Sequence, residues 1–149
     1  MRRSALALFL SLPLVACQQP APLAVKDAWT RDTVGGTANA AVYMTIESPV
    51  ADRLIAASTS AAKKTALMTM EGGSSAMGMK YLDAIDIPAD KPARLNPAGL
   101  HVWLADLNQP LKAGQSFTLT LKFEKAGERQ IAVSVLAPAA ASPMSGMQM

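Results

Sequence analysis

The chain has 149 residues, enough for one domain with a sizeable core and short appendages. Half of its residues are hydrophobic, and its formal charge of +3 depends partly on Arg2 and Arg3. Without these two, the 14 basic residues become 12 against 11 acidic residues. A nearly neutral chain has no basic patch or stripe, which argues against a nucleic-acid partner.

The first 16 residues have the pattern of a secretory signal. Arg2 and Arg3 precede the apolar run "ALALFLSLPLVA", which ends at Cys17, the single cysteine. A short apolar run behind a charged start is typical of a signal peptide. A membrane-spanning helix needs about 20 apolar residues, so a permanent transmembrane anchor is the weaker interpretation. We expect a signal peptide over residues 1–16.

The stretch "LVAC", from Leu14 to Cys17, resembles a bacterial lipobox. The resemblance implies cleavage before Cys17, lipidation of its sulfur, and a protein anchored on the periplasmic face of the bacterial envelope. An ordinary signal peptide with an incidental cysteine is the alternative. Gln18 stands where an aspartate would favour inner-membrane retention, so the outer membrane is expected. A lipidated Cys17 leaves no free thiol, and any soft metal site must then use methionine and histidine.

Residues 17–24 are expected to hold the lipidated cysteine and a short proline-containing tether, and residues 25–137 a single folded domain. The domain shows short runs rich in β-branched and aromatic residues between Gly, Pro, Asn and Asp clusters. The runs cover residues 25–31, 39–47, 52–59, 64–70, 78–82, 84–88, 93–96, 100–107, 116–124 and 129–136. Residues 138–149 have no pattern that could bury itself, and a disordered tail is expected there.

The strand-like runs indicate an all-β fold. In residues 116–124, Phe117, Leu119, Leu121 and Phe123 alternate with polar neighbours, as in a strand with one face on a core. No segment between residues 25 and 136 sustains a helical period of 3.6 residues for three turns. The pattern therefore predicts a single antiparallel sandwich or barrel.

Alternation also separates two groups of side chains in residues 100–107. Leu100, Val102 and Leu104 occupy one face of the predicted strand, while His101 and Trp103 occupy the other. The aliphatic side chains are expected to face the core. A lone histidine is more often a satisfied core residue than a metal ligand, but this parity places His101 and Trp103 together on the outer or rim side.

The methionines do not all behave alike in the pattern. Met44 shares a face with Val42 and Ile46, so we interpret it as core. Met68 and Met70 share a face with each other, and the apolar pattern alone would bury them as packing material, the usual use of methionine. Thioether sulfur is also a soft ligand that suits Cu(I), so both interpretations stay open.

The spacing resembles that of a known family. Met68, ten residues, Met79, twenty-one residues, His101, one residue and Trp103 follow the signature H(M)X10MX21HXM of the periplasmic copper chaperones called PCu(A)C. Further matches lie in "NAAVYMTI", "DRLIAAS", "GLHVWL", "PLKAG" and "LTLKFEKAG", so the likeness runs from about residue 25 to residue 135. The resemblance implies a cupredoxin-like antiparallel β-sandwich of Greek-key type.

The resemblance also implies a function, namely binding of Cu(I), in some members also Cu(II), for delivery to the copper centre of cytochrome oxidase. Met79 matches the central methionine of the signature, His101 its second histidine, and Met70 the extra methionine often found after the first histidine. Met68 stands where the family has histidine, and Trp103 where it has methionine. Met77 falls outside the signature.

The two departures change the expected chemistry. Met68 makes its position softer and independent of protonation, so the site should favour Cu(I) and largely lose Cu(II), which prefers nitrogen and oxygen. At acid pH copper affinity should then depend on His101 alone, because imidazole must be neutral to bind. Trp103 has no sulfur, but its indole face can cap a cation, which is worth about 0.5 to 2 kcal/mol. Alternatively, Trp103 packs a degenerate site that no longer binds copper.

Other assignments are weaker. The tail contains Met144, Met147 and Met149, which resemble the methionine-rich extensions of some family members and could raise the local Cu(I) concentration. An enzyme is not expected, because one histidine and no recognisable carboxylate pair leave little for catalysis. The main rival is a copper-free accessory lipoprotein that uses the methionines as a hydrophobic contact patch. A monomer is expected.

Overall fold

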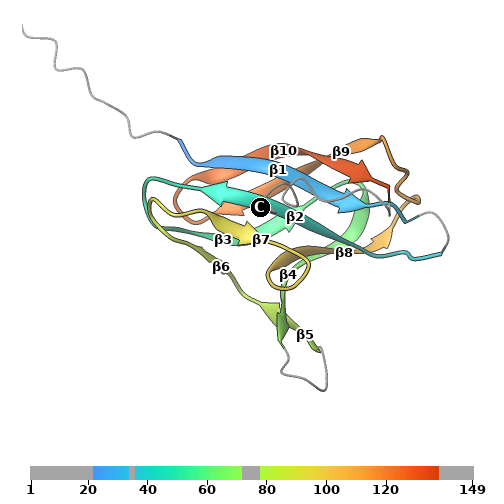
Figure 1. The fold of residues 1–149 in the computed structure, drawn as a ribbon, viewed down its shortest axis with the longest axis horizontal. Coiled ribbons are helices and arrows are strands. Elements are labelled where there is room, and N and C mark those ends of the chain that lie inside the picture. The colour runs from blue at the N-terminus through green and yellow to red at the C-terminus, as the bar shows by residue number, and fades with distance from the viewer. Residues whose placement is uncertain (1–21, 34–35, 72–77, 138–149) are drawn as a thin grey trace, which may run out of the picture.

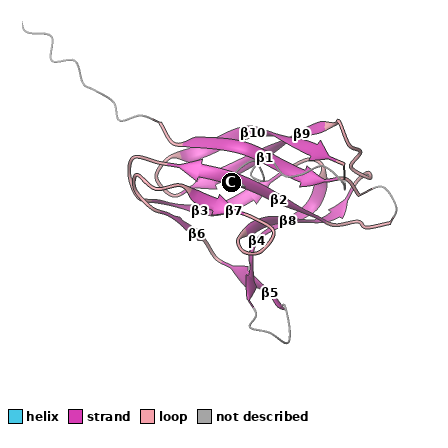
Figure 2. Cartoon of the chain, viewed as in Figure 1, coloured by secondary structure: helices cyan, strands magenta, loops and turns pink. Residues whose placement is uncertain are grey.

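The computed structural model describes residues 22–33, 36–71 and 78–137. These residues form ten β-strands, and in this part of the chain there is no helix (Figures 1 and 2), and so none that is long and apolar enough to cross a membrane. The strands are β1 (Ala24–Arg31), β2 (Ala40–Glu47), β3 (Asp52–Ser58), β4 (Ala62–Glu71), β5 (Gly78–Leu82), β6 (Ile85–Ile87), β7 (Ala93–Leu95), β8 (His101–Leu107), β9 (Ser116–Phe123) and β10 (Gly127–Leu136). The expected signal at residues 1–16, Cys17 and the tail at 138–149 lie outside the described residues.

Each of the ten predicted runs corresponds to one strand, with boundaries that differ by at most two residues. The strands are hydrogen-bonded in the order β5-β4-β8-β2-β1-β10-β9-β3-β6, and β7 pairs with β2 beside β8. This continuous sheet folds into the expected cupredoxin-like β-sandwich (Figure 1). One pair departs from the antiparallel expectation, because β1 and β10 run parallel. Parallel neighbours need a long connection, and here nearly the whole domain lies between them.

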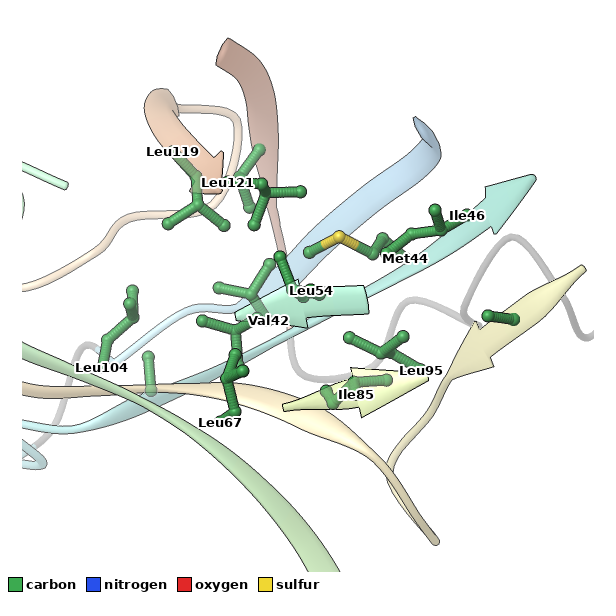
Figure 3. Close-up of a cluster of buried hydrophobic side chains, with 14 of the residues drawn as sticks. Val42, Met44, Ile46, Leu54, Leu67, Ile85, Leu95, Leu104, Leu119 and Leu121 are labelled. Atoms are coloured by element: carbon green, nitrogen blue, oxygen red, sulfur yellow. The ribbon is translucent and has the colours of Figure 1, made fainter. Parts of the chain in front are cut away.

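The core lies between the folded halves of the sheet (Figure 3). The alternation in β9 is confirmed, since Leu119, Leu121 and Phe123 are buried in this core. Met44 is 1% exposed and packs there as predicted. Burial of each leucine, phenylalanine or methionine side chain in this core contributes about 1.5 to 3 kcal/mol to the free energy of unfolding. The core therefore supplies most of the stabilisation.

A bulge in β1 sets which side chains meet on the outer face of the sheet. The β1–β2 register shifts between Lys26 and Trp29, and Asp27 within it has a φ of 53°. Aspartate tolerates this left-handed conformation better than most residues. Beyond the bulge Trp29 lies opposite Tyr43, so the extra residue brings the indole onto the face that Tyr43 occupies.

The loop between β9 and β10 is held by a buried carboxylate. Asp52 is 5% exposed; its Oδ1 accepts hydrogen bonds from the backbone N–H groups of Arg53 (2.7 Å) and Lys125 (2.9 Å), and its Oδ2 accepts one from Ala126 (2.9 Å). Burial by itself raises the pKa of Asp52, but these three hydrogen bonds and the charge of Lys125 outweigh it, so the pKa lies below the ordinary value. Asp52 is therefore a structural anion.

Candidate metal centre

The candidate ligands lie on the outer face of three neighbouring strands, β5, β4 and β8. Leu67 of β4 lies opposite Val102 of β8, and both belong to the main core. The residues that alternate with them therefore point to the other side of the sheet. The apolar pattern of β4 correctly indicated that Met68 is buried, but the main core takes Leu67 from the opposite face and not the methionine face. The strand partner decides this, since Val102 needs an apolar neighbour on the inner side.

Met68 and His101 form the central pair of this outer face. They lie directly opposite each other in the antiparallel β4–β8 ladder, which places their Cβ atoms about 4.5 to 5.5 Å apart. Each is 3% exposed, although neither belongs to the main core cluster. The parity prediction for His101 is confirmed as to its face, but the side chain is buried there rather than open at a rim.

The ring of His101 has a defined orientation. Its Nδ1 lies 3.0 Å from the backbone oxygen of Gly99. A carbonyl oxygen can only accept, so Nδ1 carries the hydrogen and Nε2 of the neutral ring keeps its lone pair. Within the described part of the chain, Nε2 makes no hydrogen bond. Every fully buried side-chain nitrogen or oxygen of these residues has a hydrogen-bond partner. Nε2 is therefore not fully buried and retains some solvent access. Nε2 is therefore available as a ligand.

The next pair along the sheet consists of two more thioethers. Met70 of β4 lies directly opposite Met79 of β5, on the face that also carries Met68. Exposure increases outward through the three methionines: Met68 is buried, Met70 is half-buried and Met79 is 49% exposed. Figure 1 shows β5 at the end of an arm that projects from the body of the fold. Met77 lies outside the described residues.

Trp103 borders the other side of the central pair. It lies opposite Ala66 of β4, two positions along the ladder from Met68 and His101 and therefore next to them on the same face. Its ring centroid is 6.3 Å from that of His101, and the two planes are nearly perpendicular at 70°. The structure thus brings Met68, Met70, Met79, His101 and Trp103 onto one continuous face, with Trp103 next to His101 and farther along the sheet from Met79.

Sequence reasoning missed three aromatic residues on this face. Tyr43 of β2 has its ring centroid 6.2 Å from that of His101 and 4.8 Å from that of Trp29. Tyr81 of β5 lies opposite Met68 and is 71% exposed. Alternation with Val42 and Met44 could have placed Tyr43 on the outer side. Trp29 could not be found in this way, because the bulge in β1 interrupts the alternation.

The face is largely uncharged. Burial raises the pKa of the Tyr43 hydroxyl, while the nearby charge of Arg31 lowers it, and burial is the larger effect. Tyr43 is therefore neutral at physiological pH. Within the described ranges, no group of three or more His, Cys, Asp or Glu side chains is placed to hold a metal ion. The donors that this face offers are three thioether sulfurs and one imidazole nitrogen.

Known proteins resemble this chain over nearly all of the described fold. The family model described as LpqE-like lipoprotein matches residues 23–135. A lipoprotein of Leifsonia xyli subsp. xyli (strain CTCB07), Lxx21020, is 41% identical over 49 residues, which are 33% of this chain and 30% of that protein. The match thus spans less than a third of that relative's length.

Solved structures of PCuAC domains have the same fold. The copper-bound PCuAC domain from PmoF2 is 28% identical, with a TM-score of 0.65 over 80% of this chain and 97% of that domain. The solution structure of CuI-DR1885 from Deinococcus radiodurans is 31% identical, with a TM-score of 0.65 over 81% of this chain and 83% of that one. Since the family model covers most of the chain and these domains share its fold, the chain belongs to the LpqE-like family of lipoproteins.

Proposed function

We propose that this protein is an extracytoplasmic copper chaperone that carries Cu(I) on the outer face of β5, β4 and β8. One observation carries the proposal: Met68 and Met70 of β4, Met79 of β5 and His101 of β8 meet on one face beside Trp103. The copper-bound state of the similar PmoF2 domain supports it.

The donor set suits Cu(I) better than other metal ions. Thioether sulfur and imidazole nitrogen are soft or borderline neutral ligands, which Cu(I) accepts in small numbers. Met68 and the Nε2 atom of His101 are the central ligands in this proposal. Met70 and Met79 lie two ladder positions farther along, next on the same face, where directly opposed side chains can both reach an ion held between the strands. Cu(I) is the cargo of the chaperone. Because all of these ligands are neutral, the bound ion retains its positive charge.

Trp103 is proposed to shield this charge. Its ring lies beside His101, where it can cover the ion on the side away from Met79 and contribute a cation–π interaction of about 0.5 to 2 kcal/mol. Tyr43 closes the face on the β2 side of His101. The replacement of histidine by Met68 removes one of the nitrogen ligands that Cu(II) prefers, so Cu(II) binding should be weak.

The gradient of exposure suggests how copper leaves the site. Met68 and His101 are buried, while Met79 is half exposed on the edge strand β5. A copper-accepting protein can therefore replace Met79 first, without prior opening of the fold. The copper centre of cytochrome oxidase is the proposed acceptor. Cys17 is proposed to carry the lipid that holds the protein on the periplasmic face of the outer membrane, and the tail methionines Met144, Met147 and Met149 are proposed to capture Cu(I).

A competition titration tests this function. The chain from residue 22 onward contains all ten strands, and we expect it to take Cu(I) from a chromophoric chelator at micromolar concentrations. Met68→Ala and His101→Ala should each weaken binding at least 10-fold. Met44→Leu changes a core methionine of similar size and should leave affinity unchanged. If the unmodified chain fails to compete, the chaperone function is excluded.

The same titration decides the rival function. Met79 and Tyr81 are two of the three large hydrophobic side chains that are exposed among the described residues, and both lie on the edge strand β5. An accessory protein without copper would use this strand as a contact surface. Such a protein would not compete with the chelator for Cu(I). The substitutions at Met68 and His101 would then change only the free energy of unfolding.

A further inference from the structure

We infer that Asn96 is a positioning residue for His101: through the turn at residues 96–100 it fixes the hydrogen on Nδ1 and leaves Nε2 as the metal-binding nitrogen. The evidence for this role consists of the hydrogen bonds within the turn and the one from the turn to His101. Its consequence for copper rests on the proposed function, but its effect on the histidine ring does not.

The turn connects β7 to β8 and begins at Asn96. The backbone N–H of Gly99 donates to the backbone oxygen of Asn96 (3.1 Å), and that of Asn96 donates to the backbone oxygen of Leu100 (2.9 Å). The sequence Asn-Pro-Ala-Gly places asparagine first, proline second and glycine fourth, as type I turns favour. Ala98 does not have the positive φ that a type II turn requires at this position.

The side chain of Asn96 closes a second ring inside this turn. Its Oδ1 accepts a hydrogen bond from the backbone N–H of Ala98 at 3.0 Å. An asparagine side chain that bonds to the backbone two residues later selects one turn geometry from several. Pro97 and Ala98 are exposed, so the turn has little packing to hold it in shape. The Asn96 side chain is therefore a principal local restraint on the position of Gly99.

The backbone oxygen of Gly99 connects the turn to the candidate site. It accepts from Nδ1 of His101 at 3.0 Å and from the backbone N–H of Met70 at 3.1 Å. One carbonyl thus orients the imidazole and also fixes the end of β4 that carries Met70. If Gly99 moves, the ring loses its acceptor and the hydrogen can shift between the two nitrogens. A partner on the second nitrogen is the usual way that proteins orient a ligand histidine.

The chain offers matched variants for a test. Asn96→Ala removes the acceptor, while Asn96→Asp retains an oxygen in its place. Gly99→Ala keeps the carbonyl, and the added Cβ would meet nothing closer than Oδ1 of Asn96 at 3.6 Å, an ordinary contact. Asn108→Ala removes a similar side-chain hydrogen bond, to the backbone oxygen of Ser60, beyond the opposite end of β8.

The first readout is the nitrogen NMR spectrum of the His101 ring, measured without copper on the chain from residue 22 onward above pH 8. His101 is the single histidine, so its ring signals need no assignment. We expect Nδ1 to show a protonated shift and Nε2 an unprotonated one. In Asn96→Ala the two shifts should converge, whereas Asn96→Asp, Gly99→Ala and Asn108→Ala should keep them apart. A hydrogen on Nε2 in the unmodified chain, or unchanged shifts in Asn96→Ala, overturns the inference.

The second readout is Cu(I) affinity, measured by chelator competition. Asn96→Ala should weaken binding by about 10-fold, as for other residues that orient a ligand, and Asn96→Asp should recover most of this loss. If no variant binds copper but the ring shifts respond as expected, the proposed function fails while the positioning role stands. If copper binds equally well in Asn96→Ala although its ring shifts converge, the role of Asn96 in copper affinity is wrong.

Discussion

Met68 and His101 lie directly opposite each other in the β4–β8 ladder, and both are buried on the side of the sheet that faces away from the main core. Aromatic side chains lie beside both residues on this face, because the ring of Tyr43 is 6.2 Å from that of His101 and Tyr81 lies opposite Met68. The outer face thus forms a small second cluster. A soft donor pair in such a cluster can be held in place and partly protected from water before any ion binds.

Substitution of Met68 and Met79 should separate packing from ligation. Met68→Ala should lower the free energy of unfolding by about 2 to 5 kcal/mol, because it leaves a cavity, and should also weaken Cu(I) binding. Met79→Ala should weaken Cu(I) binding without a comparable loss of stability, because this side chain is 49% exposed. Denaturant titration and chelator competition measure the two effects. Val50→Ala, at the same exposure, should change neither quantity; equal destabilisation by both methionine variants would contradict the exposure gradient.

Introduction of a second histidine should change the metal preference. Met68→His would place two imidazoles directly opposite each other across β4 and β8, at a Cβ separation of about 4.5 to 5.5 Å. Because Cu(II) prefers nitrogen ligands, this variant should bind Cu(II) at least 10-fold more tightly than the unmodified chain. Electron paramagnetic resonance of a Cu(II) titration reports the bound ion. Met68→Leu is the control without a donor; an equal Cu(II) signal from it would place the ion elsewhere.

Tryptophan fluorescence should report Cu(I) at one of the two indoles. Trp103 lies beside His101, whereas Trp29 reaches that ring only through Tyr43. In Trp29→Phe, which leaves Trp103 as the single tryptophan, Cu(I) should quench most of the emission. In Trp103→Phe the remaining emission should change much less. The reverse order, in a chain shown to bind copper, would move the ion toward β1.

Asp52 should make stability depend on acid pH. Because its pKa in the folded state is lowered, its contribution is complete above the unfolded value of about 3.9 and is lost as the pH falls further. Asp52→Asn should therefore flatten the decline in the free energy of unfolding below about pH 4. Asp52→Ala should cost about 1 to 3 kcal/mol near neutral pH, because backbone N–H groups lose their acceptor. Asp86→Asn, whose side chain is 89% exposed, is the control and should leave the pH profile almost unchanged; a profile that Asp52→Asn leaves equally steep would contradict the role of Asp52.

Local sequence patterns were sufficient to predict the strands and most of their faces. Alternation identified the buried side of β9 and assigned Met44 to the core, and the same rule placed His101 and Trp103 on the outer side of β8. These predictions succeeded because a strand has a period of two residues that depends only on its own backbone. In β4 the pattern correctly indicated that Met68 is buried, but the period could not show that Leu67, from the face that also carries Thr65 and Thr69, is the side chain in the main core.

Tertiary structure alone decided which residues meet across strands. The register of β4 with β5 and β8 places Met70 opposite Met79 and Met68 opposite His101, and the bulge at Asp27 brings Trp29 to Tyr43. The tertiary structure also showed that His101 is buried, with its Nδ1 hydrogen-bonded to the backbone oxygen of Gly99. By itself the sequence determined the order of the donors along the chain and which residues share a face of their own strand. Their neighbours depend on hydrogen bonds between segments far apart in the chain, and local pattern contains no information about that register.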